Sequence, residues 1–115
     1  MIHKGPANIK AEEVYDSHGG HGSCMVRTLL TSEFDSSLAY VREIVLHPNS
    51  SVGIHPHSGD EELYYIISGR GIMMVNGEQK VVKSGDVVLT KSGSSHGLRN
   101  ESDRDLRFFV VCAEL

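Results

Sequence analysis

Short apolar stretches alternate with polar, glycine-bearing turns along most of the chain. Residues 38–46, 63–67, 87–90 and 106–112 are rich in Val, Ile, Leu, Tyr and Phe, and polar turn residues bound each stretch. These side chains favour strands, and short strands spaced by about 8–12 residues are typical of a β-sandwich or closed barrel. The pattern therefore predicts an all-β fold.

The clearest local signal is the dipeptide Asn76-Gly77, which lies between the apolar stretch 72–75 and the mixed stretch 79–82. Asn-Gly favours a type I′ turn, because both central residues of that turn have positive φ angles that match the twist of paired strands. The sequence therefore predicts a tight hairpin here.

The N-terminal part has a weaker pattern. Residues 11–14 fit either one helical turn or the approach to a strand, and three glycines surround His21 in a loop. The length of 115 residues suits one compact domain. We therefore expect a single domain over residues 1–115, with residues 1–30 forming an extension and edge strands.

Composition narrows the range of partners. The net charge of -4 and the lack of a basic run argue against nucleic acid. No apolar run reaches transmembrane length, and residues 1–6 lack the apolar core of a signal peptide. Cys24 and Cys112 form no disulfide framework. We expect a cytoplasmic protein whose partner is a small molecule, with neither nucleic acid nor membrane bound.

The seven histidines are the unusual feature of the composition. His55 and His57 stand two positions apart, so a strand turns both to the same face. After a turn, Glu62 begins the returning strand beside them, and His96 opens a later strand after a glycine loop. Three imidazoles and one carboxylate suit Mn, Fe, Co, Ni or Zn. We predict one divalent transition metal ion per chain.

These spacings resemble the two motifs of the cupin family. The first motif is Gly, five residues, His-x-His, three or four residues, Glu, six residues and Gly. Residues 49–69 match it through His55, His57, Glu62 and Gly69, with Asn49 in the place of the first glycine.

The second motif is Gly, five residues, Pro-x-Gly, two residues, His, three residues and Asn. Residues 85–100 match it through Gly85, Gly93, His96 and Asn100, with Lys91 in the place of proline. Both departures are turn positions, and Asn tolerates positive φ better than most residues.

The resemblance implies a double-stranded β-helix, or jelly-roll, barrel. It also implies a metal near one mouth of the barrel on His55, His57, Glu62 and His96. The set is similar to that of the germin and oxalate decarboxylase branch, in which a chelating substrate meets the ion. Small cupins often form homodimers, for which the outward residues Leu63, Tyr65 and Ile67 are suited, unless they pack within the barrel.

Several other side chains are candidates for the pocket. Arg42 shares a strand face with Tyr40 and either meets an anionic ligand or faces solvent beside an acidic neighbour. Tyr64 either donates a hydrogen bond or a proton to the ligand, or is ordinary core. By parity and by position, Tyr64 and Phe108 are candidates to line the pocket, with ordinary core as the alternative for Phe108, and Tyr40 and Val110 are also expected on its wall.

The sequence leaves the reaction open. One hypothesis is a metal-dependent dioxygenase, decarboxylase or isomerase acting on a small anionic or oxygenated metabolite, with Arg42 and Tyr64 as catalytic candidates. The alternative is a binding module without turnover. The absence of a DNA-binding domain favours the enzyme. His18, His21 and His47 have no assigned role, although the first two could reach over a barrel mouth.

Overall fold

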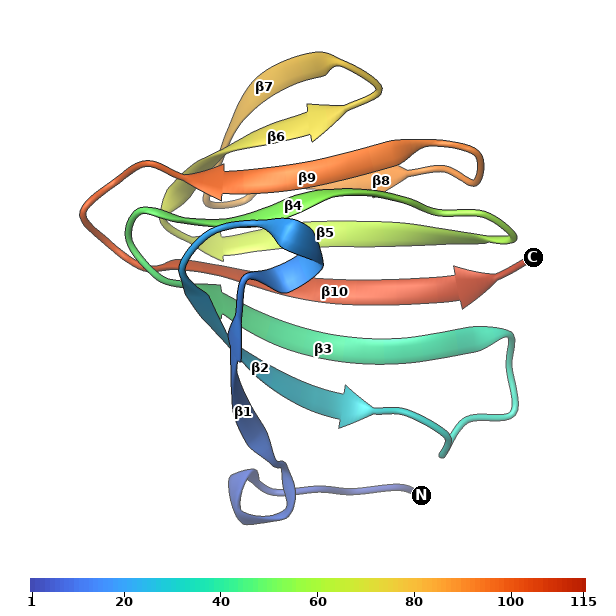
Figure 1. Cartoon of the computed structure of the whole chain (residues 1–115). Helices are drawn as coiled ribbons and strands as arrows, with labels where there is room; N and C mark the ends of the chain where they lie inside the picture. Colours follow the sequence, from blue (N-terminus) through green and yellow to red (C-terminus); the bar gives the residue numbers. More distant parts are fainter.

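Strands account for most of the chain, and the computed structural model describes all 115 residues (Figure 1). Two short 3-10 helices, η1 (Pro6–Asn8) and η2 (Ser17–Gly19), lie near the N-terminus. The strands are β1 (Ala11–Tyr15), β2 (Ser23–Leu30), β3 (Leu38–Leu46), β4 (Ser50–Pro56), β5 (Asp60–Ser68), β6 (Arg70–Val75), β7 (Glu78–Lys83), β8 (Val87–Thr90), β9 (Ser95–Asn100) and β10 (Leu106–Glu114).

The strands form two sheets, and every pairing is antiparallel. A six-stranded sheet has the order β1-β2-β3-β10-β5-β8, and a four-stranded sheet has the order β4-β9-β6-β7. Figure 1 shows the two sheets facing each other, as in the expected double-stranded β-helix. None of the helices is both long and apolar enough to cross a bilayer.

The N-terminal residues complete the larger sheet. Residues 11–14, for which a helical turn was one alternative, lie in β1, and Val14 pairs with Cys24 of β2. The helical alternative is therefore wrong. The pairing with β2 supplies the strand hydrogen bonds that a five-residue segment could not provide alone.

Two asparagines take the backbone conformations expected of them. Asn76 and Gly77 have φ angles of 50° and 82° between β6 and β7, as a type I′ turn requires. Asn49, in the place of a motif glycine, has a φ of 58° before β4. The substitution thus keeps the left-handed turn that leads into the strand of His55.

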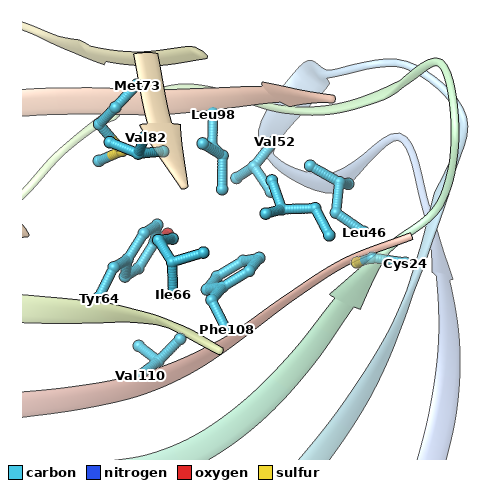
Figure 2. Packing of buried hydrophobic residues seen from close by; sticks show 11 residues of the cluster. Cys24, Leu46, Val52, Tyr64, Ile66, Met73, Val82, Leu98, Phe108 and Val110 are labelled. Atoms are coloured by element: carbon cyan, nitrogen blue, oxygen red, sulfur yellow. The ribbon is translucent and has the colours of Figure 1, made fainter. Parts of the chain in front are cut away.

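The hydrophobic core lies between the two sheets. Figure 2 shows Ile66 and Phe108 of the larger sheet beneath Leu98 of the smaller one, and each of these side chains is at most 1% exposed. Along β5 the alternation is regular, since Glu62, Tyr64 and Ile66 are buried while Tyr65 and Ile67 are exposed.

Register aligns the inward residues of the larger sheet in rows across the strands. The rows run Glu62–Cys112–Tyr40, then Tyr64–Val110–Arg42–Thr28, then Ile66–Phe108–Ile44–Val26. Successive rows are about 7 Å apart, two residues along each strand. The first two rows and the β3 and β2 ends of the third face the candidate site.

Candidate metal centre

Four donor atoms from three strands and one turn converge between the sheets. His55 in β4 pairs in register with His96 in β9, His57 follows β4, and Glu62 lies in β5. The His96 Nε2 atom is 3.0 Å from His57 Nε2, 3.1 Å from His55 Nε2 and 3.1 Å from Glu62 Oε1. All four residues therefore offer one atom to a common point, as a metal site requires.

Backbone and side-chain acceptors fix the ring tautomers of two histidines. His55 Nδ1 lies 2.8 Å from the Gly53 carbonyl oxygen, and His57 Nδ1 lies 2.9 Å from Asp60 Oδ1. A carbonyl or carboxylate oxygen only accepts, so each Nδ1 carries the proton. The two Nε2 atoms therefore direct lone pairs toward the common point, which is the arrangement of metal-ligating histidines.

His96 has a different outer partner. Its Nδ1 lies 2.8 Å from the hydroxyl oxygen of Thr90, and both side chains are fully buried. The hydroxyl can accept the Nδ1 proton, which leaves the third Nε2 free as a ligand.

Glu62 supplies the negative charge. Its Oε1 faces the imidazoles, 3.2 Å from His57 Nε2, while the hydroxyl of Tyr40 donates to Oε2. Burial acts to raise the pKa of Glu62, but the nearby His96 and His57 and the hydrogen bond from Tyr40 outweigh it and lower that pKa. The carboxylate is therefore ionised, while burial and Glu62 raise the pKa of Tyr40 and keep its phenol protonated.

The donor set fits a divalent ion. The Nε2 lone pairs of the three histidines and the carboxylate of Glu62 face one another with no proton between them, so they repel one another. A cation at their centre removes this repulsion. Adjacent ligands about 2.1 Å from an ion are about 3.0 Å apart at right angles and about 3.4 Å apart at tetrahedral angles. The observed separations of 3.0–3.2 Å lie within this span, so the donor atoms are spaced as ligands of one ion are.

Cysteine takes no part in this donor set. The Sγ atom of Cys112 lies 3.6 Å from Asp60 Oδ2, close to His57. Burial raises the pKa of the Cys112 thiol to about 11. The thiol is therefore protonated at neutral pH, and a protonated thiol is a poor ligand.

A cavity of about 440 Å³ adjoins the metal centre, and 18 residues line it. Among these are Tyr40, Tyr64 and Val110. Phe108 is not on the cavity wall. Its side chain is fully buried and packs against the Tyr64 ring, with 4.7 Å between the ring centroids (Figure 2). The Tyr64 ring also lies near the imidazole of His96, with 5.1 Å between the ring centroids.

Arg42 faces the cavity. Its guanidinium carbon lies 3.8 Å from the centroid of the Tyr40 ring, a cation–π contact. Its Nε is buried and has no hydrogen-bond partner. The arginine is therefore neither turned to bulk solvent nor paired with an acidic neighbour, and it presents an unused donor to the cavity.

Sequence reasoning gave no role to His18, whose ring stacks on His55 at 3.7 Å between centroids and 11° between planes. The loop that carries it lies against β4 (Figure 1). A Cβ atom on Gly53 would lie 2.1 Å from the His18 carbonyl oxygen, and one on Gly20 would lie 2.2 Å from the Ser51 carbonyl oxygen. The signals in the sequence were two glycines, Gly20 in this loop and Gly53 in β4.

The other two unassigned histidines lie away from the cavity. His21 is exposed, whereas His47 contacts Glu13 at 3.0 Å and Asp105 at 3.1 Å. The Asp105 hydrogen bond, together with Glu13, raises the pKa of His47. This histidine thus ties β1 to the turn before β10.

Comparisons with known proteins agree with the fold. Residues 42–112 match the Cupin domain family. The oxalate-binding protein of Thermotoga maritima is 38% identical over 106 residues, covering 91% of this chain and 88% of that protein. A crystal structure from Thermotoga maritima, described as a predicted oxalate decarboxylase, superposes with a TM-score of 0.92 over all of both chains at 35% identity. A 5-nitrosalicylic acid 1,2-dioxygenase from Bradyrhizobium is 31% identical over 67 residues, 58% of this chain and 32% of that enzyme.

Proposed function

The chain belongs to the cupin family, and from that premise we propose that it binds a small oxygenated anion by chelation to a divalent metal ion. The ion would be held by His55, His57, Glu62 and His96. The observation that carries this proposal is the orientation of the imidazoles. Acceptors at Nδ1 of His55 and His57 hold the Nδ1 protons, so the Nε2 lone pairs of both rings point toward one common position.

The proposed ligand follows from the coordination that remains. Four protein donors leave two positions on a six-coordinate ion, and an oxalate-like group fills two positions with two oxygens. When bound, the ion would stabilise negative charge on those oxygens. The name of the Thermotoga maritima relative makes oxalate the first ligand to test.

The surrounding residues support this role. Arg42 offers a positive charge and an unused Nε donor to the anion. Tyr40 holds the second oxygen of Glu62, which keeps the first directed at the histidines. Tyr64 is buried beside His96, and burial raises the pKa of its phenol. It therefore stays protonated and shields the centre from the core side.

Turnover is a second candidate function. The observation in its favour is His18, an imidazole that faces the cavity beside His55 although the four-ligand set does not need it. A group that can bind or release a proton near a metal-bound anion suits decarboxylation or oxygenation. A site for binding alone has no need of it.

The test combines metal analysis with ligand titration. Wild-type protein, His57→Ala and His96→Ala are purified without a chelator, and metal per chain is measured. We expect about one ion in wild type and far less in both variants, whereas His3→Ala, an exposed histidine, serves as the control and retains the ion. Unchanged stoichiometry in both site variants would refute the site.

Calorimetric titration of metal-loaded and metal-free protein with oxalate follows. Binding that needs the metal supports the proposal, and metal-independent binding or none contradicts it. Release of CO₂ or consumption of O₂ by the loaded protein would favour the enzyme over the binding module.

We also propose that two chains associate through the outer face of β5 and β8. Tyr65 and Val87 pair in register there, and so do Leu63 and Leu89. Val87 is 61% exposed and Leu89 is 50% exposed, an apolar surface of the kind that mediates association. A dimer mass by light scattering that becomes a monomer mass in Leu89→Lys supports this interface. A monomeric wild type contradicts it.

A further inference from the structure

We infer that the ligand held at the metal centre is larger than oxalate, namely a 2-oxo or 2-hydroxy carboxylic acid that carries an apolar chain or ring. This inference rests on the proposed function, since it takes chelation to the ion as its starting point. It adds the chemical class of the part of the ligand that lies beyond the metal.

The volume of the cavity is the first observation. Its 440 Å³ equals the liquid volume of roughly 15 water molecules at ~30 Å³ each, and it falls within the range of about 300–1,000 Å³ found for sites that enclose drug-sized ligands. Oxalate has only six non-hydrogen atoms and would leave most of this space to water. A ligand that fills the cavity needs a body attached to its chelating end.

The lining gives the chemistry of that body. In the register of the larger sheet, the metal row with Glu62 and Tyr40 is followed by the row of Arg42 and Thr28. The next row on the cavity wall holds Ile44. The polar side chains of these rows thus lie nearest the ion, Ile44 and Val26 follow, and beyond Val26 the carboxylate Glu12 of β1 makes the rim polar again.

The apolar part of the wall continues across three strands. Val26 of β2 pairs with Ile44 of β3, and Val14 of β1 pairs with Cys24 of β2, and all four line the cavity. Apolar surface of this kind binds hydrocarbon and gives no stabilisation to a second anionic group. The ligand's charge therefore belongs at the metal and its hydrocarbon belongs over β1 and β2.

Arg42 restricts the orientation of the ligand's carboxylate at the metal. It has a buried Nε without a partner, and Thr28 stands across from it in the neighbouring strand. A carboxylate that shares one oxygen with the ion can accept from this guanidinium, which is the geometry that arginine favours. A 2-oxo or 2-hydroxy oxygen beside that carboxylate completes the chelate and directs the rest of the molecule toward Ile44.

The wall that would select this body comes from a separate part of the chain. Eight of the eighteen lining residues precede position 42, and the match to the family spans only residues 42–112. The metal ligands all lie within the matched region. Seven of these eight residues lie in β1, β2 and the His18 loop, so these segments contribute to ligand choice together with Arg42 and Ile44 of β3, whereas all the metal ligands lie in the two motifs.

The test is a chain-length series on metal-loaded protein by calorimetry. The ligands are oxalate, pyruvate, 2-oxobutanoate, 2-oxopentanoate and 2-oxohexanoate. Each methylene buried against the apolar wall should tighten Kd about three- to fourfold. An affinity that is flat or falls from pyruvate to 2-oxohexanoate overturns the inference.

A substitution in the cavity wall tests where the apolar part of the ligand binds. Val26→Phe fills the apolar end, so we expect 2-oxohexanoate to weaken by about tenfold or more while oxalate changes less than about twofold. Val81→Phe, at a site 59% exposed on β7, is the control and should change neither. An equal loss for both ligands in Val26→Phe overturns the placement. Should that variant not fold, Ile44→Ala must reduce the gain per methylene.

The two proposals fail differently. If no acid in the series and no oxalate binds in a metal-dependent way, the proposed function fails, and the inference fails with it. If oxalate binds and the longer acids bind no better than pyruvate, only the inference is overturned.

Discussion

Removal of the Thr90 hydroxyl is the sharpest test of how the protein prepares its histidines for a metal. Thr90 is the last residue of β8, is fully buried, and lies 2.8 Å from His96 Nδ1 through its hydroxyl oxygen. Thr90→Val keeps the shape of the side chain and deletes this one partner. The imidazole then has a buried nitrogen without a hydrogen bond.

The size of the effect follows from that nitrogen. A proton left on Nδ1 without an acceptor costs about 1–3 kcal/mol. The His96 ring avoids this cost if the proton moves to Nε2, where it points at the Nε2 atoms of His57 and His55. An ion must then displace the proton, so we expect metal affinity to fall about 10–100-fold, which is about 1.4–2.7 kcal/mol.

Two measurements check this value. Competition with a chelating dye gives the metal affinity directly. Thermal unfolding gives it independently, because the stabilisation by bound metal falls by the same free energy. For a chain of this length the metal-induced rise in Tm should shrink by about 5–10 °C.

The matched control is Thr90→Ser, which keeps the hydroxyl and loses a methyl group. We expect it to bind metal within about threefold of wild type while losing some stability in the metal-free state. The reasoning is refuted if Thr90→Val binds metal as tightly as Thr90→Ser does.

Three further predictions concern residues around the centre and away from it. Arg42→Met removes the guanidinium and its charge but keeps an unbranched apolar side chain, so titration should show metal binding within about threefold and anion binding weakened about 10–100-fold; loss of the metal would mean that the arginine is structural. Gly53→Ala places a Cβ atom 2.1 Å from a backbone oxygen of the His18 loop, so chemical denaturation should show a loss of about 1–3 kcal/mol. The control Gly5→Ala, which meets nothing within 4 Å, should change stability by less than about 0.5 kcal/mol. His47 has a raised pKa in the folded state, so its pairing stabilises the fold fully below the ordinary value of about 6.5 and loses this effect as pH rises through the raised pKa. Free energies of unfolding should therefore differ between wild type and His47→Gln at pH 6, by less than about 1 kcal/mol because the ring is partly exposed, and converge by pH 9; a difference that grows with pH would contradict the assignment.

The ligand set could be predicted in part because some of its information is local: His55 and His57 share a strand face through the two-residue period, and one turn separates them from Glu62. His96 lies far along the chain and was predicted from the match to the second cupin motif. The left-handed turn at Asn49 was predictable for the same reason, since a single residue type decides whether the chain can take that φ.

The rest of the site depends on contacts between residues distant in sequence. The position of His18 follows from two glycines, Gly20 and Gly53, that let its loop approach β4 at backbone distance. Parity placed Phe108 on the inner face of β10, but an inner face includes both the core and the cavity wall. Only the pairing with Ile66 and Ile44 and the packing against Tyr64 decide that Phe108 belongs to the core.

Arg42 shows how these two kinds of information combine. Its parity with Tyr40 was visible in the sequence, but the choice between solvent and cavity was not. That choice follows from β2, which pairs with the edge of β3 that β10 leaves free and places Thr28 opposite the arginine. Without β1 and β2, β3 would be an edge strand, and the guanidinium could turn outward to water. The N-terminal strands thus create the enclosed wall as well as line it. Changes in residues 11–30 can therefore alter what the metal centre binds without altering the motifs that hold the ion.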